Sequence, residues 1–387
     1  MVEQTHGATL NRRGTQSSKW DILPELAGPQ PIALSVADMD LPCSPAIRDA
    51  VVGRAEFGLY GYTDLPADHA EVVASWLGRV LGAEFEPGHI LYANRVVQVF
   101  ATALRTLTEP GGRVALFTPS YSPLEVTITE NGRDTVRLPL LLQDGRYVLD
   151  RELVERTLPS VKILLLVNPH NPVGKAWSGA ELEWLAAACE RHGVLIVSDE
   201  VHAAFYWGER SHRFIGELVP RSITFTSPAK TFNLPGLEIT HVIIPDDELR
   251  ATIGQAQHAA GFHNPSYMAH SATVAAYDGS SDAWLEETKR TITANLADLR
   301  AAVAGWDSIS LIEPQATFLA WLDARAVGDE RVLREWFVDR ARVYPSFGTD
   351  FGPEYDGFLR LNLATPQELF TTALDRLQHT KEGNPLS

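Results

Sequence analysis

The sequence predicts an α/β fold: a three-layer αβα arrangement around a mainly parallel sheet, followed by a smaller α+β part. Between residues 89 and 245, short apolar runs recur that are mostly continuous rather than alternating. Such runs are typical of strands buried on both faces of a parallel sheet. Patterns with a helical period lie between several of these runs, and alternation of strand and helix favours parallel strands joined by right-handed crossovers.

Each apolar run ends at a turn former or a polar residue, which sets the expected strand boundaries. The expected strands are residues 89–93, 113–118, 161–167, 194–198, 222–227 and 241–245. Apolar spacing near 3.6 predicts helices over residues 97–107 and 179–192, and Gly193 is placed to end the second as a C-cap.

After about residue 280 the pattern changes to one long amphipathic helix followed by shorter elements. We expect a helix over 282–305, strands at 309–312, 318–322 and 358–363, and helices near 330–340 and 366–379. Residues 1–30 are polar and read as an arm. Because chain ends often lie close together in a domain, we predict a large domain of residues 50–280. The predicted small domain combines residues 1–49 and 281–387.

Composition excludes several classes of protein. Lys plus Arg is 33 and Asp plus Glu is 49, so the net charge is −16, which argues against a nucleic-acid or anionic-membrane binder. The two cysteines cannot form a disulfide framework or a cysteine-rich metal site, and we expect no metal. No signal peptide or membrane span is expected, so the expected location is the cytoplasm.

Lysine is scarce in this chain, which narrows the choice for any chemistry that needs a primary amine. The six lysines are Lys19, Lys162, Lys175, Lys230, Lys289 and Lys381. Only Lys230 follows a predicted buried strand with a serine, Ser227, three residues before it.

The residues that follow the predicted strands carry the functional information, because ligands bind at the carboxyl ends of parallel strands. Taken singly, each has an ordinary structural explanation. The turn containing Asn171 could be only a turn, Asp199 a helix N-cap, Tyr121 a core aromatic and Lys230 a surface lysine.

Taken together, these residues fit the chemistry of pyridoxal 5'-phosphate (PLP). Lys230 can form the Schiff base, and Asp199 can keep the pyridine nitrogen protonated. Ser227 can hydrogen-bond the phosphate, Asn171 can reach the phenolic oxygen and Tyr121 can stack on the ring.

The chain resembles the fold-type I PLP enzymes of the aminotransferase class I/II superfamily, and within them the MalY/PatB-type cystathionine β-lyases, or cysteine-S-conjugate C–S lyases. The resemblance covers nearly the whole chain. It is carried by residues 12–21 (RRGTQSSKWD), 35–40 (SVADMD), 60–63 (YGYT), 168–174 (NPHNPVG), 198–202 (SDEVH), 348–352 (GTDFG) and 358–362 (FLRLN).

The resemblance implies a role for each candidate residue. It makes Lys230 the Schiff-base lysine and catalytic base, with Asp199, Asn171 and Tyr121 placed as above. The residues it implies as further contacts are Val96, Val97 and Ser227 for the phosphate, Tyr62 of a neighbouring subunit for the same phosphate, Arg360 for the substrate α-carboxylate, and His202 as support for Asp199. It therefore implies a homodimer with shared active sites.

Two departures from the family pattern concern the substrate. Arg95 stands where a glycine is usual before the Val-Val pair, and Ser35 replaces a tryptophan near the expected substrate position, where Tyr121 also lies. Ser35 can leave room for a larger substrate group.

The reaction implied is α,β-elimination of a cysteine S-conjugate or cystathionine to a thiol, pyruvate and ammonia. Three alternatives stay open at this point. They are an aminotransferase on the same scaffold, an oxidative decarboxylating-deaminating enzyme of natural-product biosynthesis, and a PLP-binding regulatory protein without catalysis.

Overall fold

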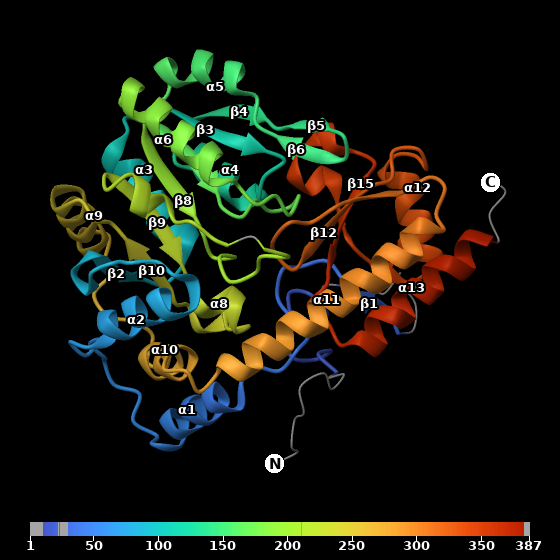
Figure 1. Ribbon diagram of the computed structural model, residues 1–387. Coiled ribbons are helices and arrows are strands. Elements are labelled where there is room, and N and C mark those ends of the chain that lie inside the picture. Colours follow the sequence, from blue (N-terminus) through green and yellow to red (C-terminus); the bar gives the residue numbers. More distant parts are fainter. Residues whose placement is uncertain (1–10, 22, 24–29, 210, 383–387) are drawn as a thin grey trace.

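The computed structural model describes residues 11–21, 23, 30–209 and 211–382. Two sheets organise this part of the chain (Figure 1), and the larger has seven strands in the order β2-β10-β9-β8-β7-β3-β4. All of them run parallel except β10, which is antiparallel to both neighbours. The strand bounds are β2 Ile90–Ala93, β3 Arg113–Thr118, β4 Asp134–Pro139, β7 Ile163–Val167, β8 Leu195–Asp199, β9 Ser222–Thr226 and β10 Thr240–Ile243.

The six strands predicted between residues 89 and 245 are all present in this sheet. The seventh strand, β4, was not predicted because it lies at the edge of the sheet and only one of its six residues is buried. An edge strand that is largely solvated carries no continuous apolar run.

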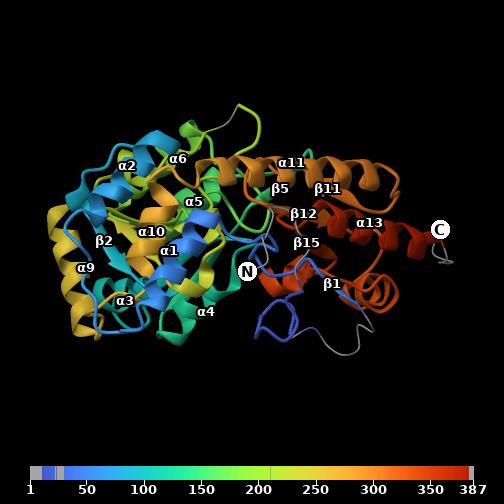
Figure 2. The same ribbon diagram turned by 90° about the horizontal axis from the view of Figure 1, so that it is seen from below.

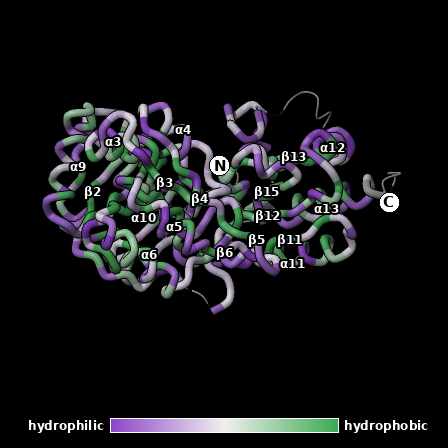
Figure 3. Tube along the Cα trace, turned by 90° about the horizontal axis from the view of Figure 1, so that it is seen from above, coloured by the Kyte–Doolittle hydropathy of each residue, from purple (hydrophilic) through white to green (hydrophobic). Residues whose placement is uncertain are grey.

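Both faces of the large sheet are buried, which confirms the three-layer prediction. Alternate residues of β7 belong to different clusters: Ile163 and Leu165 contribute to one and Leu164 and Leu166 to the other. The first cluster contains residues of α3, α4 and α9, and the second residues of α5 and α6. In the hydropathy view of Figure 3, the apolar segments lie inside the molecule.

The helices joining and covering this sheet have the following bounds: α1 Pro45–Glu56, α2 His69–Leu81, α3 Val96–Leu107, α4 Ser122–Glu130, α5 Arg151–Thr157, α6 Gly179–His192, α7 Ile215–Leu218, α8 Pro228–Thr231, α9 Asp247–Ala259 and α10 Ala269–Tyr277. A short hairpin, β5 (Leu141–Gln143) and β6 (Arg146–Val148), follows β4. Gly193 ends α6 in the left-handed conformation at φ 64°, as predicted for its C-cap.

The second sheet is antiparallel, with the order β11-β12-β15-β14, and α11 leads to it from α10 (Figure 2). Its strands are β11 Ser310–Ile312, β12 Leu319–Asp323, β14 Ser346–Phe347 and β15 Phe358–Asn362, and its helices are α11 Asp282–Ala304, α12 Glu330–Arg334 and α13 Gln367–Glu382. A π-helical turn continues α12 to residue 340.

The N-terminal segment joins this second part, because β1 (Ile32–Ala33) pairs in parallel with β13 (Val343–Tyr344). One hydrophobic cluster also extends from Ile47 and Trp76 to Leu377, so the two parts share buried contacts. The exact domain ranges therefore stay a prediction, and much of the predicted arm over residues 1–30 lies outside the described residues. No helix in the described ranges is long and apolar enough to cross a membrane.

Candidate active site at the strand ends

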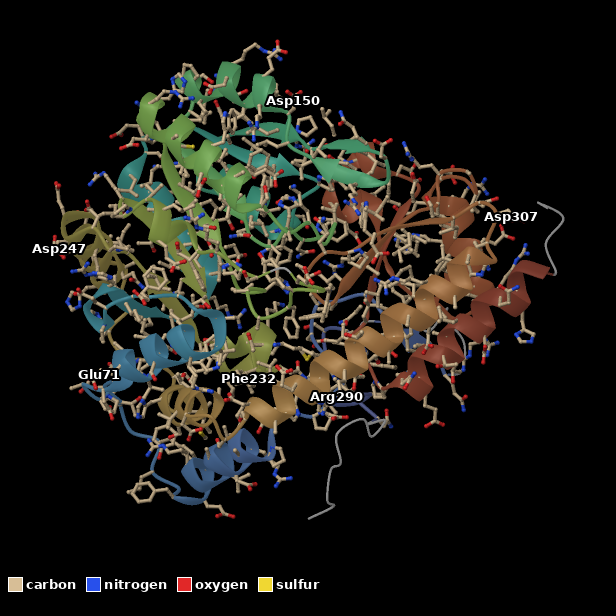
Figure 4. All side chains as sticks on the ribbon, viewed as in Figure 1. Glu71, Asp150, Phe232, Asp247, Arg290 and Asp307 are labelled. Carbon is tan, nitrogen blue, oxygen red and sulfur yellow. The ribbon has the colours of Figure 1, made fainter. Side chains whose placement is uncertain are left out.

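The parallel strands of the large sheet end at one edge, and the predicted site residues follow them there. Asp199 ends β8, and Ser227 and Lys230 follow β9 directly. Figure 4 labels Phe232, two residues after Lys230, near the junction of the two parts of the molecule. The edge of the sheet therefore faces the second part, which contributes β15.

Lys230 lies on the single turn α8, which begins after Ser227. Its Nζ donates a hydrogen bond to the Ala37 carbonyl at 2.6 Å. Burial lowers the pKa of the Lys230 amine to about 8, with Arg360 lowering it further and Asp38 and Asp199 opposing the shift. A larger share of this amine is therefore neutral at physiological pH than of an ordinary lysine amine.

Asp199 is a buried carboxylate with weak local compensation. It is 8% exposed, and its Oδ1 accepts only the Val201 amide, at 3.3 Å, among the described hydrogen bonds. Burial raises its pKa to about 6, while the charge of Lys230 opposes that rise. A cationic N–H donor beside this carboxylate would stabilise its ionised form and offset the free-energy cost of burying it.

Arg360 is supplied by β15 of the second sheet and meets Asn171, which lies in the turn after β7 of the large sheet. Its Nη1 donates to Asn171 Oδ1 at 3.0 Å, and its Nη2 donates to the Ser35 carbonyl at 2.9 Å and to Ser346 Oγ at 3.0 Å. The guanidinium is 5% exposed, and every oxygen it binds in the described residues is uncharged. Burial lowers its pKa to about 10. Its Nε is buried without a partner in the described residues.

The amide of Asn171 is oriented by this contact. Because its Oδ1 accepts from Arg360, its Nδ2 is left to act as a donor. This matches the need of a phenolic oxygen for a hydrogen-bond donor.

Tyr121 and the start of α3 follow β3 and β2 at the same edge. Tyr121 precedes α4 and is 38% exposed, and burial followed by the charge of Asp199 raises its pKa. Helix α3 begins at Val96 with no side-chain cap, so the amides of Val96 and Val97 lie at an uncapped helix start suited to an anion. The departure Arg95 pairs with Glu238, its Nε lying 2.9 Å from Glu238 Oε1.

Two predicted residues, Ser227 and His202, have surroundings that their expected roles do not account for. Ser227 Oγ caps α8 by accepting the Ala229 amide at 2.9 Å, and it donates to the Ile239 carbonyl. The His202 Nδ1 is buried without a partner in the described residues, and its ring lies 5.1 Å from that of Phe318. Burial holds the pKa of His202 well below its usual range.

Tyr62 is 98% exposed, and none of its described contacts joins it to the other site residues of the same chain. Ser35 contributes its backbone carbonyl to Arg360, while the role of its small side chain stays a prediction.

The sequence reasoning missed a buried network behind Asp199. The carboxylate of Glu200 is 2.6 Å from His212 Nε2, and it also accepts Ser198 Oγ at 2.6 Å and the Ile215 amide at 3.1 Å. Tyr206 links His212 to the turn of Asn168. Glu200 is fully buried although it carries a carboxylate, which marks it as part of an internal network, but its burial is visible only in the structure.

The residues present fit PLP. The fold supplies an amine for a Schiff base, a buried carboxylate that forms no ion pair within the described part of the chain, an uncapped helix start and an amide donor. Each of these groups complements a different part of that cofactor.

Comparisons with known proteins agree with this geometry. The model of the family "Aminotransferase class I and II" matches residues 29–377. Cystathionine β-lyase PatB of Bacillus subtilis is 35% identical over 92% of this chain and 95% of its own length. Protein MalY of Escherichia coli is 30% identical over 92% of this chain and 94% of its own length.

A solved structure is similar over nearly its whole length. Cystalysin from Treponema denticola, whose structure contains PLP, has a TM-score of 0.92 and 26% identity, covering 97% of this chain and 98% of that one. The fold, the strand-end residues and these matches together place the chain in the aminotransferase class I and II family.

Proposed function

We propose that this chain is a PLP-dependent C–S β-lyase that eliminates a thiol from a cysteine S-conjugate or from cystathionine, leaving pyruvate and ammonia. The observation that carries the proposal is that the buried Lys230 amine, at the end of the large sheet, interacts electrostatically with both the Asp199 carboxylate and the Arg360 guanidinium, which β15 of the second sheet supplies. The relatives support the same class, since PatB is named a cystathionine β-lyase and cystalysin contains PLP.

PLP, when bound, supplies an electron sink for the α-carbanion of an amino acid. The protein must then hold the substrate carboxylate, and Arg360 is the group for this. Its two Nη atoms now donate to neutral oxygens, and a carboxylate would accept both in a stronger, charge-assisted pair.

Lys230 Nζ is the base that removes the Cα proton. With a pKa of about 8, roughly one amine in ten is neutral at pH 7. An ordinary lysine would be neutral in fewer than about one molecule in a thousand. Burial therefore supplies the active form of the base without a separate activating residue.

Asp199 and Asn171 orient the ring and keep its polarity. With PLP bound, the Asp199 carboxylate would accept a hydrogen bond from the pyridine nitrogen, and the Asn171 Nδ2 would donate one to the phenolic oxygen. The departing thiolate needs little help, because the pKa of a thiol is about 8.5.

The same proposal includes a homodimer whose sites are shared. Phe57, Leu59 and Tyr60 are each about two-thirds exposed, and Tyr62 is almost fully so. A cluster of large exposed apolar and aromatic residues in one short segment favours a protein interface. In this proposal Tyr62 reaches the phosphate site of the partner subunit. The cytoplasmic location stays a prediction.

The test is an incubation of purified enzyme with S-substituted cysteines and cystathionine, without any keto acid. We expect equal amounts of pyruvate and free thiol, and no oxygen uptake. Turnover that requires a keto-acid acceptor would identify an aminotransferase, and oxygen consumption would identify the oxidative alternative.

The Lys230→Ala variant is the matched control for this assay. It should lose turnover and the cofactor absorbance that depends on a Schiff base to the protein. A variant that kept both would overturn the assignment of Lys230. Wild-type protein that binds PLP but turns over none of these substrates would favour a PLP-binding protein without catalysis.

A further inference from the structure

The segment of residues 35–41 passes between the two groups that the proposed reaction needs most. The Ser35 carbonyl accepts from Arg360 Nη2, and the Ala37 carbonyl accepts from Lys230 Nζ at 2.6 Å. One short stretch of backbone therefore contacts both the substrate-binding arginine and the reactive lysine.

Two asparagines near those residues hold the same segment. Asn233, three residues after Lys230, donates to the Met39 carbonyl at 3.1 Å and to the Leu41 carbonyl at 2.8 Å, and accepts the Met39 amide at 3.0 Å. Asn362, two residues after Arg360, donates to the Val36 carbonyl at 2.8 Å and to the Asp38 carbonyl at 2.6 Å. The position of the segment is therefore fixed from both sheets.

A compact charge cluster from the N-terminal residues completes this support. Arg12 lies 2.8 Å from Asp38 Oδ2 through Nη2 and 2.8 Å from Asp40 Oδ1 through Nη1. Lys19 Nζ lies 2.6 Å from Asp40 Oδ2, 3.0 Å from the Asp38 carbonyl and 3.7 Å from Asp38 Oδ1. Two cations thus meet two carboxylates.

The burial of this cluster indicates more than a surface ion pair. The Lys19 side chain is fully buried, whereas most lysines are exposed. Buried charges are tolerated only where each is paired, so loss of one partner leaves the others uncompensated. Asp38 differs from Asp40 in keeping 16% of its side chain exposed and in acting electrostatically on Lys230.

We propose that Asp38 is a positioning residue for Lys230: clamped by Arg12 and Lys19, it holds residues 35–41 so that the Ala37 carbonyl receives the lysine amine, and it keeps one negative charge beside that amine. The inference rests on the proposed role of Lys230. The proposal gives the N-terminal residues a part in the reaction, because Arg12 and Lys19 partly neutralise Asp38 and so set the strength of its effect on the Lys230 amine.

The charges acting on the Lys230 amine give the proposal a definite sign. Asp38 and Asp199 favour its protonated form, and Arg360 and Lys19 favour the neutral form. Removing the Asp38 charge must lower the pKa of Lys230. Removing Arg12, which neutralises Asp38, must raise it.

A purely structural role predicts a different result. If residues 35–41 only loosened, water would reach Lys230 and relieve the burial that lowers its pKa. The pKa of Lys230 would then rise in both variants. The direction in which the pKa of Lys230 shifts in Asp38→Asn therefore separates the two explanations.

The experiment measures the titration of each lysine in the full chain freed of PLP. The protein is labelled with a trace of acetic anhydride at a series of pH values, and the Lys230 peptide is quantified by mass spectrometry. In Asp38→Asn we expect the pKa of Lys230 to fall by about one pH unit from its value near 8. Labelling at pH 7 should then increase about fivefold.

Asp323→Asn is the matched control. Asp323 has the same 16% side-chain exposure and pairs with Arg325 at 2.6 Å, but it lies on β12 and has no described effect on Lys230. It should leave the Lys230 titration unchanged, and Arg12→Gln should shift it upward. An unchanged or raised pKa in Asp38→Asn, or an equal shift in Asp323→Asn, would overturn the proposal.

Two further measurements keep the result interpretable. If Asp38→Asn does not fold, Asp38→Ser takes its place, and a fall in the pKa of Lys230 in that variant decides, because a loosened segment would raise this pKa instead. In the loaded enzyme, the pH profile of kcat should move in the same direction as the labelling, because kcat reports on the enzyme–substrate complex, in which the Lys230 amine is free to act as the base. The labelling reads the amine whatever reaction the enzyme catalyses, so its failure is distinguishable from a failure of the lyase assay.

Discussion

At the scale of single residues, the buried carboxylate of Asp199, which we propose binds the cofactor, lowers the stability of the folded chain. The fold buries its carboxylate and offers it one long hydrogen bond, so its pKa is raised from 3.8 to about 6. A shift of two pH units corresponds to about 3 kcal/mol. Burial outweighs the opposing charge of Lys230, so the ionised Asp199 destabilises the folded chain.

We predict that Asp199→Asn stabilises the cofactor-free protein by about 2 kcal/mol at pH 7.5 while abolishing turnover. The folded pKa lies above the unfolded value, so the cost is fully present above pH 6 and disappears below about pH 4. The gain in stability of Asp199→Asn should therefore be largest above pH 6 and vanish below about pH 4. Urea unfolding of both proteins between pH 7.5 and 4 measures it.

Asp323→Asn again serves as the control, since it removes a carboxylate that Arg325 already binds through Nε and Nη2. That variant should lose stability rather than gain it. A destabilised Asp199→Asn protein at pH 7.5 would show that the carboxylate has a stronger partner than the Val201 amide.

At the scale of elements, α3 brings backbone amides rather than side chains to the site. It is twelve residues long, follows β2 at the carboxyl edge of the sheet, and has no side-chain cap. Its first amides and its dipole favour an anion at that end. If the phosphate lies at this end, as proposed, backbone amides hold it locally, and the net charge of −16 does not prevent binding of an anionic cofactor.

We predict that Val96→Pro weakens PLP binding roughly tenfold while keeping the helix, because a charge-assisted hydrogen bond contributes about 1.5–3 kcal/mol. Proline is tolerated at the first position of a helix, where it removes only the free amide. The preceding Arg95 is already extended, at φ −137° and ψ 145°, as a residue before proline requires. Titration of the cofactor-free chain with PLP gives the dissociation constant.

Asp247→Pro makes the same change at the start of α9, on the outer side of the molecule (Figure 4). It should leave PLP affinity unchanged. If Val96→Pro bound PLP normally with its circular dichroism intact, the phosphate would have to lie elsewhere.

At the scale of the whole molecule, the exposed segment containing Tyr62 predicts that two chains complete each site. We expect Tyr62→Ala and Lys230→Ala proteins, each impaired alone, to recover activity when mixed and allowed to exchange subunits. Random pairing leaves about one quarter of all sites with both residues intact. Activity without added PLP measures the recovery.

The test requires proof that mixed dimers have formed. A tag on one variant verifies that mixed dimers have formed, and two copies of the same variant provide the baseline. Mixed dimers without recovered activity would mean that Tyr62 serves its own subunit or no site, and a monomeric protein would remove the proposal of sharing.

The sequence by itself determined the fold class, the family and the class of reaction. Lys230 and Asp199 were identifiable because Asp199 stands at the end of a buried strand and Lys230 a few residues after one, and a parallel sheet brings such positions to one edge. The match to the family model and the 35% identity to a cystathionine β-lyase confirm that much. The roles of the individual site residues stay predictions.

Only the tertiary structure decided how these residues are supported. Lys19 and Asp40 lie 21 positions apart, and Asn233 and Met39 lie 194 positions apart, so no local pattern predicts that they meet. Nor does local sequence reveal that Lys19 is buried or that the Ala37 carbonyl receives Lys230. Burial and long-range contacts set the local dielectric and the neighbouring charges, and these decide the proton affinity of each group.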